Sequence, residues 1–564
     1  MKGTLIFAVG LLLSASVASA QSGRPEGRHY VQNRDGQSGD VRSAGLQASQ
    51  TLQLTVDEAV RRAVEHNPDL ASVRFGTQVE AARVSESESA YAPVFSTVVG
   101  TSSNVAPPSN FLLGERGVDT KDLFTSTGVR QRVPWGSGTW NFSWDTSRST
   151  SNNPLTSFDP ALQSGFQLAL SQPLLRDRKM DLARQQTIVA KRNLESSELR
   201  VRESIVQTTA AVKHAYWTLK ATLANVMLQQ RSLELAQELV RQNKARVDVG
   251  QTPPLDLLQA EAEVAQRREN LIRANTAAGD AEDRLRRLIM DPADASFWRV
   301  RLDPTDEPAF GGGLPDVDAV AAASFDERYD LARARKDLQN IVTNVEFFND
   351  QKLPDVRLET SYRGNGLGGT RFLRTGEFPG TIVGTARRNY GSVLGQMFDS
   401  TYPTWSVGVK VSYSLGRSFE EAGLARAQVE RRQAAQRISS LQLQIAETLR
   451  QAVRQVHSTA ERIEAARAGT SVARQRLDVE QRRFEVGLST SFLVTQAQRD
   501  LLQTEVNLLQ ATLDHQSARV SFEALQQAPA LGDGQGTTQR GSNVLQLGPA
   551  APTGVFRPGS GSGF

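Results

Sequence analysis

Cysteine is absent from the 564 residues of this chain. This absence excludes disulfides, thiolate metal sites, cysteine nucleophiles and a lipid-modified N-terminal cysteine. The five histidines lie far apart in the sequence, so no metal-ligand spacing is visible. P-loops, zinc motifs and nucleophile elbows are missing as well. We therefore expect no enzyme activity, no metal and no cofactor.

A surplus of one charge and long apolar runs are also lacking. The 65 Lys and Arg residues are balanced by 61 Asp and Glu residues, for a net charge of +4. Without a dense basic run, the sequence gives no sign of a nucleic-acid partner. No segment after the N-terminus approaches the ~18 uninterrupted apolar residues of a transmembrane helix.

The first twenty residues are predicted to be a secretory signal peptide. Lys2 is followed by the apolar run Leu5–Leu13, and Ala18–Ala20 forms a small-residue cleavage site before Gln21. This order of features is typical of an export signal, and the apolar run is too short to span a membrane. The mature protein is then secreted, periplasmic, or inserted in an outer membrane as β-strands.

The rest of the chain contains two copies of one plan. Asp57–Val60 resembles Asp318–Ala321, and Arg246–Gly250 resembles Arg483–Gly487. Similar segments in the same order indicate an internal duplication. The predicted organisation is a signal peptide at 1–20, a disordered segment at 21–50, a first repeat with its linker at 51–314, a second repeat at 315–527, and a disordered tail at 528–564.

Each repeat is predicted to contain a first helix, a strand region, a long helix, a tight turn and a third helix. The predicted helices are Thr55–Ala92, Arg176–Asp248 and Pro253–Met290 in the first repeat, and Asp316–Leu353, Gly416–Glu485 and Ser489–Gln527 in the second. Pro93 and Pro354 end the first helices. A long helix would measure ~105–110 Å, which matches its two shorter partners stacked end to end. This arrangement predicts a rod of long antiparallel coiled-coil helices.

A seven-residue apolar repeat supports this packing. Its members in the first long helix are Ile205, Val212, Leu219, Val226, Leu233, Val240 and Val247. The equivalent positions in the second are Gln442, Leu449, Val456, Ile463, Thr470, Leu477 and Phe484. A sustained repeat of this period is typical of a left-handed coiled coil.

Segments between the first and second helices alternate between apolar and polar residues. The pattern is clear in 405–415, 356–363 and 166–171, and weaker in 94–102. Such alternation is typical of a transmembrane β-barrel strand, although an ordinary half-buried sheet remains an alternative. Four strands cannot close a barrel, because the smallest have about eight and lipid does not tolerate open edges. The barrel must therefore be shared between protomers.

The strand region also includes a possible extra hairpin and two segments expected to be loops. A further hairpin near 129–145 is possible, and the sequence does not decide whether it joins the barrel. The Gly-, Asn- and Ser-rich segments near 103–124 and 364–403 are expected to be extracellular loops.

Taken together, these features resemble the outer membrane efflux protein family, the TolC-like channels, over about 51–527. The strongest motifs are Arg483–Phe492, which leads to Gln496–Gln498, and Leu170–Leu175 after a strand. The resemblance implies a mainly α fold with β: a long helical barrel in the periplasm and a twelve-strand transmembrane β-barrel in the outer membrane of a Gram-negative-type envelope. It also implies a homotrimer in contact with outer-membrane lipid, a periplasmic adaptor protein and an inner-membrane transporter.

The same resemblance indicates candidate tip and gate residues. The turns at Val249, Gly250, Val486, Gly487 and Leu488 would lie at the closed periplasmic tip, where adaptors dock. Asp256 occupies the place of an acidic gate residue, but a charged latch is doubtful because Ser489 replaces its basic partner. Phe484 replaces the gate tyrosine, and Leu493 and Gln496 replace the acidic ring of the entrance. Asp256 is equally well explained as a solvated acid favoured by the helix dipole.

The expected function is therefore an outer-membrane channel of a tripartite efflux or type I secretion system. It would conduct small molecules or proteins from the periplasm or an inner-membrane pump to the outside. The alternative is a structural coiled-coil protein of the envelope without transport. The alternating strands and the matched helix lengths favour the channel, because a stalk needs neither.

Overall fold

A computed structural model describes residues 51–107, 117–250, 253–291, 293–294, 298–308, 317–377, 380–416 and 418–530. The predicted signal peptide at 1–20 and the segment 21–50 lie outside these residues, as does the predicted tail from 531 onward. The first residues of that tail are described. Ala528 is fully buried, and its N–H donates to the carbonyl oxygen of Ala524.

The first helix of each repeat is split in two, so the prediction of one continuous helix was wrong. In the first repeat α1 (Val56–His66) and α2 (Pro68–Glu88) are separated by Asn67, and the single turn η1 (Ser89–Tyr91) follows. The Asn67 side chain caps α2 by accepting hydrogen bonds from two backbone N–H groups, and Pro68 is the first residue of that helix. Both features favour the start of a new helix.

The second repeat is interrupted at the corresponding place, between α5 (Val317–Glu327) and α6 (Tyr329–Gln351). Arg328 separates these helices, and its guanidinium is buried. It contacts the Asp330 carboxylate at 2.7 Å and donates to the carbonyl oxygen of Leu525 in α9. The break therefore places an arginine where it ties the first helices of the second repeat to the end of the third.

The long helices are α3 (Leu182–Asp248) and α8 (Phe419–Glu485), each of 67 residues and therefore ~100 Å in length. They end where predicted but begin later, because Asp181 and Ser418 are their N-caps. The third helices, α4 (Pro254–Ile289) and α9 (Ser491–Leu525), agree with prediction to within two residues.

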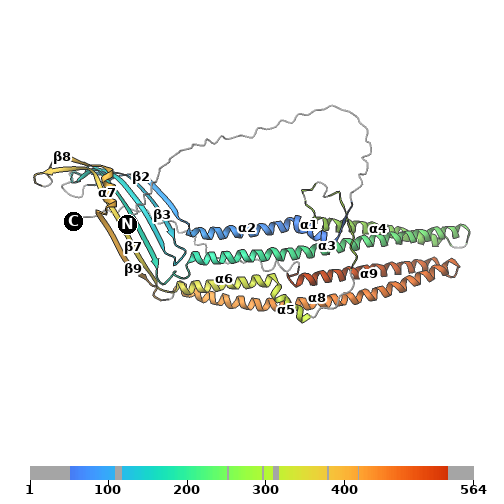
Figure 1. Ribbon diagram of the computed structural model, residues 1–564. Helices are drawn as coiled ribbons and strands as arrows, with labels where there is room; N and C mark the ends of the chain where they lie inside the picture. Colours follow the sequence, from blue (N-terminus) through green and yellow to red (C-terminus); the bar gives the residue numbers. More distant parts are fainter. Residues whose placement is uncertain are drawn as a thin grey trace, which may run out of the picture. The chain divides into compact units, whose positions relative to one another are not determined.

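The helices pack as the sequence predicted (Figure 1). α3 contacts α1, α2 and α4, and α8 contacts α5, α6 and α9. α3 also packs against α6 and α9, which joins the two repeats. Every residue of the predicted seven-residue seam is buried or half-buried in both long helices. The prediction of long antiparallel helices with an apolar seam is confirmed.

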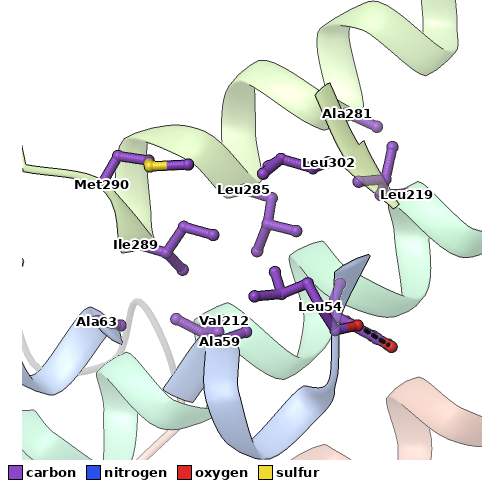
Figure 2. Packing of buried hydrophobic residues seen from close by; sticks show 11 residues of the cluster. Leu54, Ala59, Ala63, Val212, Leu219, Ala281, Leu285, Ile289, Met290 and Leu302 are labelled. Carbon is purple, nitrogen blue, oxygen red and sulfur yellow. Dashed lines mark hydrogen bonds between the residues drawn. The ribbon is translucent and has the colours of Figure 1, made fainter. Parts of the chain in front are cut away.

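A small parallel sheet packs against the helices of the first repeat. Its strands are β1 (Thr51–Leu54) and β6 (Arg301–Pro304), and Leu54 and Leu302 pack into a cluster with residues of α1, α3 and α4 (Figure 2). The Tyr216 hydroxyl donates to the Leu54 carbonyl oxygen and accepts from the Asp306 N–H. Burial raises the pKa of Tyr216 to about 12. The cluster fixes the segment before α1 and the segment after α4 onto the long helix.

The second sheet is antiparallel and larger than predicted. It consists of β2 (Val94–Ala106), β3 (Val118–Arg132), β4 (Thr139–Ser151), β5 (Phe158–Pro173), β7 (Asp355–Thr375), β8 (Thr381–Arg388) and β9 (Tyr402–Ser412). The order is β2-β3-β4-β5-β7-β8, and β9 also pairs with β7. The count of four strands was therefore wrong, because the possible hairpin near 129–145 forms β3 and β4 inside this sheet.

The strands also continue through segments expected to be loops, 103–106, 118–124, 364–375 and 381–388. The glycines of β7 have a packing role rather than a loop role. The short helix α7 (Tyr390–Phe398) lies against this part of the sheet, and a Cβ atom at Gly366 would overlap the carbonyl oxygen of Val393. Glycine is needed here because a helix backbone approaches the strand closely.

Candidate functional site

The turn between α8 and α9 is a Schellman motif. The Leu488 N–H donates to the carbonyl oxygen of Arg483 at 2.8 Å, and the Gly487 N–H donates to that of Phe484 at 3.1 Å. Gly487 has a φ of +76°. This pair of hydrogen bonds defines the motif, and its positive φ is the reason that glycine occupies the position.

The turn between α3 and α4 has the same start. Gly250 has a φ of +73°, and its N–H donates to the carbonyl oxygen of Val247 at 2.9 Å. Pro253 and Pro254 then begin α4. The two turns therefore share a backbone conformation at equivalent positions, which agrees with the repeat seen in the sequence.

Both turns expose apolar side chains. Val486 and Leu488 are 70% and 78% exposed, and Val249 is exposed at the other turn. The neighbouring exposed apolar residues are Leu255, Leu258, Phe492 and Leu493. Each turn follows 67 residues of helix that start beside the large sheet. The turns thus lie far from the sheet, and in a single chain their apolar side chains are exposed to solvent.

Phe484 is buried, only 3% exposed, and belongs to a cluster with Leu239, Leu477, Val494 and Ala497. The Arg246 guanidinium lies 4.0 Å from the centre of its ring and donates to its carbonyl oxygen at 2.9 Å. This cation–π contact and hydrogen bond connect α3 of the first repeat to α8 of the second just before their turns. The position expected for a gate aromatic therefore joins the two helix hairpins.

Asp256 and Ser489 are not joined by a hydrogen bond within the described residues. Asp256 lies in the first turn of α4, and its carbonyl oxygen accepts from the Asn243 side chain. The Ser489 hydroxyl instead donates to the Glu480 carboxylate at 2.8 Å. Asp256 and Ser489 therefore each contact a residue on the neighbouring long helix, Asn243 of α3 and Glu480 of α8.

Leu493 and Gln496 lie on the first turns of α9. Leu493 is exposed, and Gln496 is half-buried with its amide donating to Asp500 at 2.8 Å. Neither side chain carries a charge. Asp500 is also paired with Arg476 at 2.8 Å, so its carboxylate is not a free acidic group.

A second connection between the repeats was not predicted. The nearly buried carboxylate of Glu263 in α4 contacts Arg267 at 2.6 Å and accepts from Arg499 of α9 at 3.1 Å. Burial raises the pKa of the Glu263 carboxyl, but the hydrogen bond from Arg499 and the charge of Arg267 outweigh it and hold this pKa below its usual value. The four-residue spacing of Glu263 and Arg267 was visible in the sequence, whereas their distant partner was not.

Arg246 was also missed as a site residue, although a signal was present. It begins the Arg246–Gly250 motif, and Arg483 begins the equivalent motif of the second repeat. In the structure only the first of the two arginines stacks on a ring, whereas Arg483 contacts Glu480 at 3.4 Å.

Among the described residues, no cluster of three or more His, Asp or Glu side chains is placed to hold a metal ion. Within the same part of the chain, no helix is both long and apolar enough to cross a membrane.

Residues 138–289 and 323–526, together more than half of the chain, match the family described as outer membrane efflux protein. The chain belongs to the outer membrane efflux protein family. It is an outer-membrane efflux channel of the type found in tripartite systems of Gram-negative bacteria, with a periplasmic extension. The predicted resemblance, function and localisation are confirmed.

Solved structures share the fold at low sequence identity. A membrane protein from Pseudomonas aeruginosa aligns with a TM-score of 0.60 and 15% identity, covering 85% of this chain and 93% of that one. The CmeC outer membrane channel of Campylobacter jejuni aligns with a TM-score of 0.59 and 14% identity, covering 88% of this chain and 94% of that one. VceC from Vibrio cholerae aligns with a TM-score of 0.58 and 14% identity, covering 84% of this chain and 96% of that one. Among curated proteins, no sequence matches the chain.

Proposed function

We propose that three copies of this chain form one continuous duct. The large sheets of the copies would together make the β-barrel in the outer membrane, and α3, α4, α8 and α9 of each copy would line a helical tunnel below it. The support is the incomplete sheet. The part of the chain that the structure describes has too few long strands to close a barrel, for which about eight are needed. The observation that carries the proposal is this open sheet attached to two 67-residue helices.

The two helix turns are the proposed docking site for a periplasmic adaptor protein. Their exposed apolar residues, Val249, Val486 and Leu488, would be covered by the partner. Exposed apolar patches commonly mark protein–protein contacts. An inner-membrane transporter would deliver the cargo, either small molecules or proteins, and the channel would need no cofactor and do no chemistry.

The closed state of the tip is proposed to depend on contacts between the two helix hairpins of each chain. The stack of Arg246 on Phe484 and the pairing of Arg499 with Glu263 both cross from one repeat to the other. Opening would separate these hairpins. Asp256, Ser489, Leu493 and Gln496 would lie near the entrance, where the uncharged Leu493 and Gln496 would make the entrance weakly selective for charge.

The proposal can be tested by cross-linking in cells, since the chain has no cysteine of its own. Leu488→Cys places a single thiol on the exposed turn, and a thiol–amine cross-linker should capture a periplasmic adaptor, identified by mass spectrometry. Glu377→Cys, beyond β7 at the other end of the sheet, is the matched control and should capture none. Both variants should restore efflux of a fluorescent dye to a strain that lacks the wild-type gene. Failure of the wild-type protein to lower dye accumulation in that strain would count against the duct.

A further inference from the structure

The large sheet has two long edges without a strand partner in the described residues. β2 pairs only with β3 along its whole length, and β9 pairs only with β7. All residues of β9 are exposed, as are all but two of β2. In an outer-membrane protein such edges cannot face lipid, because their N–H and C=O groups would lack hydrogen-bond partners.

The directions of these two edges suit each other. β2 leaves the helices directly after η1, and β9 runs back toward α8. Between them the long strands β3, β4, β5 and β7 alternate in direction, so the six long strands form an antiparallel series that ends opposite to the way it began. β9 of one copy would therefore lie antiparallel to β2 of the next, as every other pair in the sheet does.

The β3–β4 hairpin continues both faces of the sheet without interruption. One row of directly paired residues is apolar on all six long strands: Phe95, Val129, Phe142, Leu168, Tyr362 and Trp405. The next row, on the opposite face, is Ser96, Gly128, Ser143, Gln167, Arg363 and Thr404. An apolar outer face and a polar inner face are what a barrel wall requires. The hairpin fits the wall as well as the four strands found from the sequence do.

We propose that the β3–β4 hairpin is part of the membrane wall, between β2 and β5, and that β2 of each copy pairs with β9 of its neighbour. With three copies and six long strands from each, the barrel would have eighteen strands instead of the twelve implied by the family resemblance. The number rests on the proposed trimer, whereas the pairing of the two edges does not. Because barrel diameter grows roughly linearly with strand number, the lumen would be about 1.5 times as wide as that of a twelve-stranded barrel.

The competing arrangement keeps the hairpin outside the wall. β2 would then pair directly with β5, and each copy would contribute β2, β5, β7 and β9. In the structure two strands separate β2 from β5, and β4 is paired with β5 from Thr139 to Ser149. Direct contact between β2 and β5 would require that pairing to be lost.

Disulfide cross-linking in the cysteine-free chain tests both parts of the proposal. Pairs between β2 and β9 test the closure between copies, which both arrangements share, and a pair between β2 and β5 decides whether the hairpin lies in the wall. Ser406→Cys on the polar face of β9 is combined in turn with Ser96→Cys, Ser102→Cys or Asn104→Cys, which lie on the polar face of β2. Several positions are needed because closing a barrel staggers the strands. The matched controls combine Ser406→Cys with Thr97→Cys, Thr101→Cys or Ser103→Cys, whose side chains point to the other face.

A positive control and a competing pair complete the design. Ser361→Cys with Ser406→Cys joins directly paired residues of β7 and β9, whose hydroxyl oxygens are 2.8 Å apart, and should oxidise within one chain. Ser96→Cys with Gln167→Cys joins β2 to β5 and should not oxidise. The readout is electrophoresis without reductant of protein oxidised in outer membranes.

We expect at least one same-face β2–β9 pair to give covalent dimers and trimers, with little or no product from the opposite-face pairs. A β2–β5 disulfide overturns the proposal, and so does the absence of every β2–β9 disulfide when the β7–β9 control oxidises. The mass of the same variants in detergent separates the two proposals. A trimer without β2–β9 disulfides leaves the proposed duct standing and rejects this closure, whereas a monomer rejects the duct itself.

Discussion

Gly487 is the residue whose backbone most directly determines the shape of the α8–α9 turn. Its φ of +76° is strained for any residue with a Cβ atom, and nothing lies within 4 Å of the place that a Cβ would occupy. A substitution there therefore alters the turn without a steric clash elsewhere. The cost of a β-branched residue in this conformation is ~1–2 kcal/mol.

We predict that Gly487→Val leaves the protein assembled in the outer membrane but impairs efflux and adaptor cross-linking. Gly366 would be a poor control, because any Cβ there overlaps α7. Gly376 is the better match, with a φ of +92° and open space around it, but beyond the far end of β7. Gly376→Val should efflux normally. Normal dye efflux by Gly487→Val would mean that the turn is only a connector.

His515 of α9 makes packing sensitive to acid. It is buried, and its Nδ1 lies 3.2 Å from the Thr459 hydroxyl of α8. Burial, together with the charge of Arg519, lowers the pKa of this histidine despite an opposing backbone interaction at Val456. As the pH falls, His515 therefore takes up a proton at a higher pH in the unfolded chain than in the folded chain.

The contribution of neutral His515 to the free energy of unfolding is complete above the unfolded-state pKa, about 6.5. It is lost as the pH falls below that value. We predict that the melting temperature of the purified protein falls between pH 7.5 and pH 5. His515→Gln, which retains a hydrogen-bonding side chain, should show a smaller fall. Equal falls for the two proteins would assign the acid sensitivity to other groups, such as His214, whose pKa is also lowered by burial.

The long helices are held by their seam, as a pair of substitutions should demonstrate. Leu233 is buried on the seam and Arg231, two residues earlier, is exposed. We predict that Leu233→Asp destabilises the protein by at least about 3 kcal/mol, since it removes buried apolar contacts and buries an ion. Arg231→Asp should change stability by about 0.5 kcal/mol or less. Thermal unfolding of both variants checks the difference, and equal melting temperatures would contradict the seam.

The helices were predicted best, because helical periodicity can be recognised within a single segment of the sequence. The ends of α3 at Asp248 and of α8 at Glu485, directly before the Val-Gly turns, were predicted. The break at Asn67 was also readable, since Asn followed by Pro is a helix-start signal, but the apolar pattern on both sides suggested one helix. Local signals of this kind need no knowledge of what packs against them.

Strand pairing and the contacts of the site depend on residues far apart in the chain, so fewer of them could be predicted. Alternation indicated a possible hairpin near 129–145 but not the strands beside it, because period two does not specify a partner. Likewise the Val-Gly turns were found, whereas the stack of Arg246 on Phe484 joins residues 238 positions apart. The contact becomes visible only when the two repeats are packed together.

The proposed barrel needs several copies of the chain. The six long strands of the described residues are too few for a closed barrel, and among these residues both outer strands have an unpaired edge. We predict a stable homotrimer in mild detergent. Light scattering, corrected for bound detergent, should give the mass of three polypeptides, and a monodisperse monomer would contradict the shared barrel.

An end-on electron-microscope image of the detergent-purified protein would show whether three copies enclose one duct. We predict averages with threefold symmetry around a central opening, and side views that show a helical extension of ~100 Å from the membrane-embedded end. Averages without rotational symmetry, or a threefold particle with no opening along its axis at the level of the β-sheets, would contradict it.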